Sequence, residues 1–153
     1  MAAKAAKDVD AVSVSGYPEP FRSRVLPREV RRLGDAFGLE EIGVSLVTVF
    51  PGKESSVRHT HTHEDELVYM LEGELVLHTN DGEEPFRPGM VVGFRAGDGN
   101  AHHFLNRSDR NATYLVVSNR HPEDGAVYPD IDLAARKKDG KVVFTRKDGS
   151  PAA

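Results

Sequence analysis

Apolar and polar residues alternate in several short runs of the chain from residue 43 onward. A period of two is typical of β-strands that bury one face. The clearest run covers residues 44–50, which are rich in β-branched side chains and stop at Pro51 and Gly52. Further strands are expected at residues 56–61, 66–72, 74–79, 90–94, 101–106 and 112–118. Glycine, asparagine, aspartate and proline mark turns between these runs, so the pattern predicts an all-β sandwich or jelly-roll barrel.

The two ends of the chain carry weaker patterns. Residues 1–20 are rich in alanine and small polar residues, and we expect a flexible N-terminal segment there. We expect either a short helical turn or a loop at residues 28–36, and one more strand at residues 141–146. Residues 21–153 should then form a single domain, since single cores typically span roughly 50–200 residues.

The composition excludes several classes of protein. A formal net charge of −4 at pH 7 argues against general nucleic-acid binding, which needs a clustered basic surface. The chain has no cysteine, so disulfide and thiolate chemistry are excluded. No apolar run resembles a signal peptide or approaches the ~18 residues that span a bilayer. We therefore expect a cytoplasmic protein that contacts neither nucleic acid nor membrane.

A group of chemically reactive side chains lies between two of the predicted strands. His59 and His61 are two residues apart, so on an extended strand both imidazoles point to one face. Glu66 opens the next strand and can return to the same point. It is favoured over the neighbouring carboxylates because Val68 and Met70 share its parity and form an apolar inward face. Two neutral nitrogens and one carboxylate oxygen suit a divalent first-row transition metal.

His63 has the same parity as His59 and His61, which leaves two interpretations. It could be a third histidine ligand on the strand, or the turn before Glu66 could move it to the rim of the pocket. We favour the rim, because the strand should turn before Glu66. There His63 would bind substrate or move a proton, since its reference pKa near 6.5 suits proton transfer.

A fourth candidate ligand lies downstream in the predicted strand at residues 101–106. His102, Phe104 and Asn106 share one face of this strand, and His103 lies on the other. Phe104 is expected to form an apolar wall of the pocket. His103 is expected to be a packed or interface residue.

The two segments together resemble the two signature motifs of the cupin superfamily. The first motif is matched by Gly52, His59, His61, Glu66 and Gly73, with one extra residue between Gly52 and His59. The second is matched by Gly89, Arg95, Gly97, His102 and Asn106. Arg95 replaces the usual proline of this motif, and four residues instead of two separate Gly97 from His102. These departures fall in the loop before His102 and leave the metal-contacting spacings intact.

The resemblance implies a double-stranded β-helix, or jelly-roll barrel, with short N- and C-terminal extensions. It implies one divalent metal, either manganese, iron, nickel, cobalt or zinc, held by His59, His61, Glu66 and His102. Arg95, Phe104 and Asn106 would bind the substrate, and Glu66 and His63 would move protons. Small cupins usually form homodimers, and Tyr69, opposite in parity to Glu66, is expected to face outward toward a second subunit.

Three functions remain open at this stage. The chain resembles small bacterial single-domain cupins that are sometimes labelled sugar-phosphate isomerases, which implies a metal-dependent isomerase acting on a sugar or sugar phosphate. An iron-dependent dioxygenase would use the same ligands. A non-catalytic cupin that binds or senses a small molecule would use the same pocket.

Overall fold

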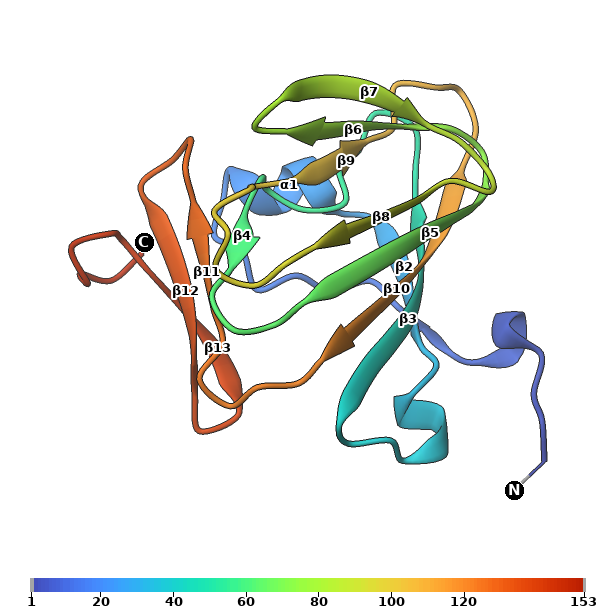
Figure 1. Ribbon diagram of the computed structural model, residues 1–153, viewed down its shortest axis with the longest axis horizontal. Helices are drawn as coiled ribbons and strands as arrows, with labels where there is room; N and C mark the ends of the chain where they lie inside the picture. Colours follow the sequence, from blue (N-terminus) through green and yellow to red (C-terminus); the bar gives the residue numbers. More distant parts are fainter. Residues whose placement is uncertain (1, 153) are drawn as a thin grey trace.

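The computed structural model describes residues 2–152, and its strands form a barrel with a further small sheet at one end (Figure 1). One wall of the barrel is a six-stranded antiparallel sheet in the order β1 (Ala11–Val12), β2 (Arg28–Arg32), β3 (Ile42–Val49), β10 (Ala112–Asn119), β5 (Glu66–Glu72) and β8 (Val91–Phe94). The facing wall consists of β7 (Gly82–Phe86), β6 (Leu75–Thr79) and β9 (His103–Leu105). The expected all-β jelly-roll barrel is confirmed.

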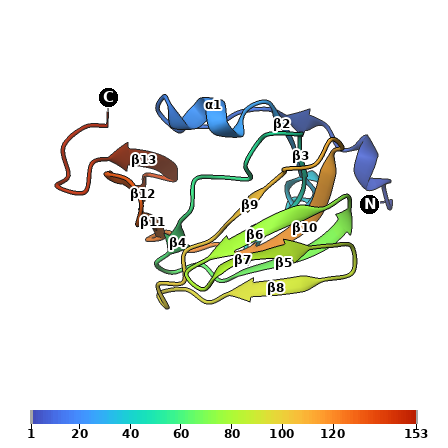
Figure 2. The same cartoon turned by 90° about the horizontal axis from the view of Figure 1, so that it is seen from above.

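A four-stranded sheet lies beside one end of the barrel (Figures 1 and 2). It contains β13 (Lys141–Thr145), β12 (Leu133–Lys138), β11 (Gly125–Tyr128) and β4 (Thr60–His61). We call it the C-terminal sheet, although β4 comes from the histidine segment. The helical elements are short: the 3-10 helices η1 (Ala6–Asp8) and η2 (Asp35–Phe37), and α1 (Phe21–Val25). No helix within residues 2–152 is both long and apolar enough to cross a membrane.

On the strands that the sequence predicts, successive residues alternate between the buried core and the surface of the barrel. On β5, Val68 and Met70 are fully buried, whereas Leu67 and Tyr69 are 48% and 43% exposed. The buried side chains of both walls form one apolar cluster in which Val68 and Met70 join Leu75, Leu77 and Phe104. Glu66 continues the inward parity of β5, so its carboxylate points into the same interior.

Most of the predicted strands are present within two residues of the expected bounds. The run at residues 56–61 is the exception, because only Thr60–His61 is a strand. The prediction for residues 28–36 was wrong: Arg28–Arg32 is β2, which pairs with β3, and only Asp35–Phe37 is helical. Four charged residues in that strand hide its character in the sequence, and the partner strand stabilises it.

Segments at both ends of the chain add to the barrel. Ala11–Val12 pairs with β2, and Tyr17 is buried, so the N-terminal segment contacts the rest of the fold from residue 11 onward. Neither β11 nor β12 was expected from the sequence. Their buried residues join Tyr17 and Val25 in a second apolar cluster at the end of the barrel.

Candidate metal centre

Backbone pairing brings together four side chains from three segments. His59 and His102 form an isolated antiparallel bridge, in which each backbone N–H donates to the other's carbonyl oxygen at 3.1 and 2.9 Å. His61 follows two residues later on β4, and Glu66 is the first residue of β5. The structure therefore places the four predicted metal ligands in one cluster.

The distances between the donor atoms of His59, His61 and Glu66 fit a single ion. Nε2 of His59 lies 3.1 Å from Nε2 of His61. One carboxylate oxygen of Glu66 lies 3.5 Å from Nε2 of His61, and the other lies 3.3 Å from Nε2 of His102. Donors bound about 2.1 Å from one ion are roughly 3.0–3.4 Å apart in octahedral or tetrahedral geometry. His59, His61 and Glu66 thus have the spacing that a first-row ion requires, and His102 lies next to the second carboxylate oxygen of Glu66.

Hydrogen bonds orient two of the imidazoles so that their Nε2 atoms face each other. Nδ1 of His59 donates to the carbonyl oxygen of Val57 at 2.8 Å, and Nδ1 of His61 donates to the carboxylate of Asp124 at 2.8 Å. A neutral imidazole protonated on Nδ1 carries a lone pair on Nε2. Two such lone pairs repel unless a proton or a metal cation lies between them. The pair is therefore arranged to bind a cation.

The electrostatics of the cluster also favour a cation. Burial, together with the nearby His102 and His61, lowers the pKa of His59 to about 4. Burial also opposes a charge on His61, but Glu66 and Asp124 outweigh it and raise the pKa of His61 to about 9. Burial alone would raise the pKa of Glu66, yet hydrogen bonds from His102 and His61 hold it well below its usual range. A divalent ion could replace the proton on His61 and neutralise the carboxylate.

Asp124 is a component of the site that the sequence did not reveal. It is only 5% exposed and lies just before β11. Besides His61, it accepts hydrogen bonds from the backbone N–H groups of His63 and Glu64 at 2.9 and 3.0 Å. A carboxylate that holds a ligating histidine in this way fixes its ring orientation and raises its basicity. In the sequence, Asp124 and Gly125 resemble any Asp-Gly turn, so no local signal could have identified it.

Packing, and not a hydrogen bond to Nδ1, holds the far side of the His102 ring. The ring stacks on Phe94 with centroids 3.4 Å apart and planes 5° apart. Its Nδ1 is buried and has no hydrogen-bond partner among residues 2–152. The aromatic contact therefore fixes the direction in which Nε2 points toward Glu66.

A cavity of about 180 Å³ opens inside the barrel next to these donors, and we call it the barrel cavity. Glu66 is the only carboxylate among its lining residues, and Phe104 forms part of its wall as predicted. The residues that line it are Ser55, Ser56, His59, Glu66, His102, Phe104, Tyr114 and Val116.

The structure does not bring the other predicted site residues into this cavity. His63 is exposed at the rim, where its ring stacks on His121 with centroids 4.5 Å apart. Arg95 is exposed and lines a shallow groove that also touches Glu66. Asn106 is buried, but its amide donates to the carbonyl oxygens of Val49 and Arg110, so its side chain holds a loop.

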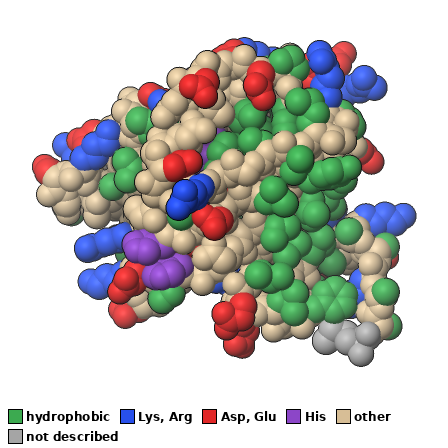
Figure 3. Space-filling view, viewed as in Figure 1, with side chains coloured by type: hydrophobic (Ala, Val, Ile, Leu, Met, Phe, Trp, Pro, Cys, Tyr) green, Lys and Arg blue, Asp and Glu red, His purple; other side chains and the backbone are tan. Residues whose placement is uncertain are grey.

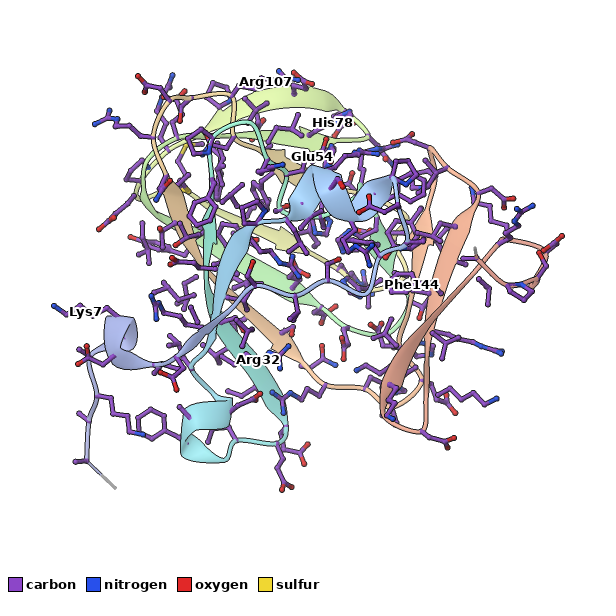
Figure 4. The ribbon with its side chains drawn as sticks, turned by 180° about the vertical axis from the view of Figure 1, so that it is seen from behind. Lys7, Arg32, Glu54, His78, Arg107 and Phe144 are labelled. Carbon is purple, nitrogen blue, oxygen red and sulfur yellow. The ribbon has the colours of Figure 1, made fainter. Side chains whose placement is uncertain are left out.

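His103 points away from the metal ligands, as the strand parity predicts. Its Nδ1 donates to the carbonyl oxygen of Ser56 at 3.0 Å, and its Nε2 lies 3.1 Å from Nδ1 of His78. Glu54 completes this group at 3.7 Å from His103, and it also pairs with Arg24 of α1, beside which it lies in Figure 4. This is a packed polar group outside the barrel cavity.

Comparisons with known proteins agree with this fold. The family model described as Cupin domain matches residues 45–118. The crystal structure of a protein from Silicibacter pomeroyi, described as a sugar phosphate isomerase from a cupin superfamily, superimposes on this chain with a TM-score of 0.91. The two sequences are 44% identical, and the match covers 96% of this chain and 94% of that protein. A proposed sugar phosphate isomerase from Acidithiobacillus ferrooxidans is 31% identical over 82% of this chain and 80% of its own, with a TM-score of 0.74. A polyketide cyclase from Streptomyces resistomycificus, 23% identical over 81% of this chain and 83% of its own with a TM-score of 0.66, shares the fold alone. No curated protein matched significantly.

Proposed function

The chain belongs to the cupin superfamily, and from this membership and the four converging donors we propose a metal-dependent enzyme that acts on small oxygen-containing compounds. The observation that carries the proposal is the position of the donors. His59, Glu66 and His102 line the barrel cavity, and His61 lies next to His59 and Glu66, so a bound ion would be reachable by a small molecule.

Within this class we propose an isomerase that moves a proton between neighbouring carbons of a hydroxy-carbonyl compound. The two relatives described as sugar phosphate isomerases support this choice, as does the single carboxylate in the cavity. His59, His61, Glu66 and His102 would hold the divalent ion. When bound, such an ion polarises carbonyl and hydroxyl oxygens as a Lewis acid.

Other steps of the reaction fall to side chains that line the barrel cavity. Glu66 supplies the carboxylate of the barrel cavity, which could accept a proton from the carbon beside the carbonyl and return it to the next carbon. Tyr114 keeps its hydroxyl proton because burial raises its pKa, so it can donate a hydrogen bond to a substrate oxygen. Phe104 and Val116 exclude water around these groups, which strengthens both interactions.

Two measurements test the proposal. Elemental analysis of protein purified without a histidine tag should find one divalent transition metal per chain. Incubation with aldoses, their phosphates and aromatic hydroxy-ketones in D₂O should show deuterium uptake at the carbon beside the carbonyl of at least one compound.

A matched pair of variants completes the test. Glu66→Gln should abolish the deuterium uptake, whereas Glu72→Gln, an exposed carboxylate at the far end of β5, should retain it. Stoichiometric metal with no uptake from any compound in the panel would instead favour a binding cupin, and uptake of dioxygen by the iron form would favour a dioxygenase.

A further inference from the structure

A second cavity, of about 230 Å³, lies between the C-terminal sheet and the histidine segment. We call it the flank cavity. It is bordered by His59, His61 and Asp124 on one side and by Tyr128 and Ala135 on the other. Most of its wall comes from residues outside the stretch that matches the cupin family, 45–118.

The wall that the C-terminal sheet contributes is apolar. Ala126 pairs with Ala135, and both are buried on the face that points toward the barrel. Phe144 and Tyr17 close the end of this face with ring centroids 5.2 Å apart, and Phe144 lies between the C-terminal sheet and the barrel in Figure 4. Two alanines opposite each other leave the open volume, because larger side chains there would fill it.

The charged groups at this wall already have partners. Lys137 binds the carboxylate of Glu64 at 2.5 Å and the carbonyl oxygen of His121 at 3.0 Å. Asp124 is engaged by His61 and by two backbone N–H groups. Arg136 also borders the cavity, but strand alternation turns its exposed side chain to the opposite face from Ala135. A phosphate would therefore meet cations that are already paired or turned away, and a sugar would bury hydroxyls against alanine and aromatic ring carbons, which is costly.

The flank cavity and the barrel cavity meet at the candidate metal centre. Ser56 and His59 line both cavities, His61 lines only the flank cavity, and Glu66 and His102 line only the barrel cavity. An ion on Nε2 of His59 and His61 would therefore be held by residues that line the flank cavity, and Glu66 and His102 would reach it from the barrel cavity. One ligand could thus bind the ion with its oxygen atoms and extend into the flank cavity.

We infer that the flank cavity holds an uncharged, apolar ring of the ligand whose oxygen atoms bind the metal. An apolar cavity of ~150 Å³ accommodates benzene, so the flank cavity has room for a substituted six-membered ring. The inference rests on the proposed function and narrows it: the compound carries a ring beside its hydroxy-carbonyl group and is not a free sugar phosphate.

Two hydroxamates test the inference, because they share a chelating head and differ in the ring. Acetohydroxamate and benzohydroxamate would be titrated into the cobalt-loaded protein, with the visible absorption of cobalt as the readout. We expect benzohydroxamate to bind at least about tenfold more tightly, since burial of a phenyl ring contributes an effect of this order. Equal affinities would overturn the inference. So would tighter binding of a hydroxamate that carries a phosphorylated four-carbon chain.

Variants on the two faces of β12 locate the ring. Ala135→Leu fills the flank cavity and should reduce the preference for benzohydroxamate to less than threefold, with acetohydroxamate affinity unchanged. Ala134→Leu, on the opposite face of the same strand, should keep the full preference. If Ala135→Leu does not fold, Ala126→Val takes its place. A preference that survives a filled cavity would place the ring elsewhere.

A metal-free measurement separates this inference from the proposed function. Failure of cobalt or acetohydroxamate to bind would count against the metal centre itself. In the metal-free protein, benzohydroxamate should still shift the methyl resonances of Ala126 and Ala135 in NMR spectra. Unmoved methyl resonances at millimolar benzohydroxamate would overturn the flank cavity as a ring-binding site.

Discussion

Asp124 accepts a hydrogen bond from Nδ1 of His61 at 2.8 Å, although 63 residues separate them in the sequence. The contact joins the C-terminal sheet to the metal ligands, because Asp124 precedes β11 and His61 lies on β4. Without it, the ring of His61 would lose the partner that directs its Nε2 toward His59 and Glu66.

Replacement of this carboxylate should therefore weaken metal binding. Asp124→Asn removes the charge but keeps the size, and we expect the metal affinity to fall about 10- to 100-fold, the usual effect of removing such a partner. Competition with a chromophoric chelator measures the affinity. Glu83→Gln is the control, since Glu83 is exposed and pairs with Arg107 away from the cluster; an equal loss in both variants would contradict a specific role for Asp124.

Metal affinity should rise with pH. The pKa of His61 is raised to about 9, so near neutral pH a metal must displace its proton. We expect the apparent affinity to increase about tenfold per pH unit from pH 7 to 9 and then to level off. The stability of the metal-free fold should change in the opposite direction. Because the pKa of His61 is higher in the folded chain, its protonation stabilises the fold below about pH 6.5, and this contribution is lost as the pH rises through 9. An affinity that does not change between pH 7 and 9 would show that His61 binds no proton there.

Removal of the metal should lower the melting temperature of the wild type. An ion that binds only the folded chain adds about 2.7 kcal/mol of stability at a hundredfold excess over its dissociation constant. Glu66→Gln should bind metal weakly, while its metal-free stability stays equal or increases because a buried charge is gone. Melting curves with and without chelator measure both effects. Strong destabilisation of metal-free Glu66→Gln would show that Glu66 is a structural residue.

The outer face of the six-stranded sheet should form a homodimer interface, which we propose from its apolar rows. Leu115 pairs with Leu46 on one side and with Tyr69 on the other, and Tyr69 pairs with Val91 on the edge strand β8. Figure 3 shows a broad apolar area over this sheet. An exposed apolar patch next to an edge strand commonly marks an interface.

Light scattering at micromolar concentration should therefore report a dimer. Tyr69→Glu should convert it to a monomer. The control is Val127→Glu, a residue of similar exposure on the C-terminal sheet, which should leave the dimer intact. A monomeric wild type would overturn the proposal.

Gly73 should tolerate substitution less than Gly52, although both have positive φ angles, +75° and +78°. A Cβ atom on Gly73 would lie 2.5 Å from the carbonyl oxygen of Asn111, whereas nothing lies within 4 Å of one on Gly52. Gly52→Ala should lower the free energy of unfolding by only about 1–2 kcal/mol, because alanine is strained in the left-handed backbone conformation. Gly73→Ala should cost more because the backbone of Asn111 must move, and urea unfolding of both variants checks the difference. Equal losses would contradict the close approach.

The sequence by itself determined the strands with clear alternation and the ligands that local parity controls. On β5, the residues that face inward follow from a period of two, and with them the choice of Glu66 over its neighbours. The grouping of His59 and His61 also needed only their spacing. The assignment of His102 as the fourth ligand came from the resemblance to the cupin motifs. The β-bridge between His59 and His102 is the contact that brings the two histidines together.

Only the tertiary structure decided the features that depend on distant segments. β2 is a strand because β3 pairs with it, although its own residues do not alternate clearly. Asn106 shares the parity of His102, yet its amide serves the loop because Val49 and Arg110 come within hydrogen-bond distance. The contact of Asp124 with His61 and the flank cavity both arise because β11 pairs with β4 of the histidine segment. Local periodicity records which face of a strand is buried, but it holds no information about which distant segment covers that face.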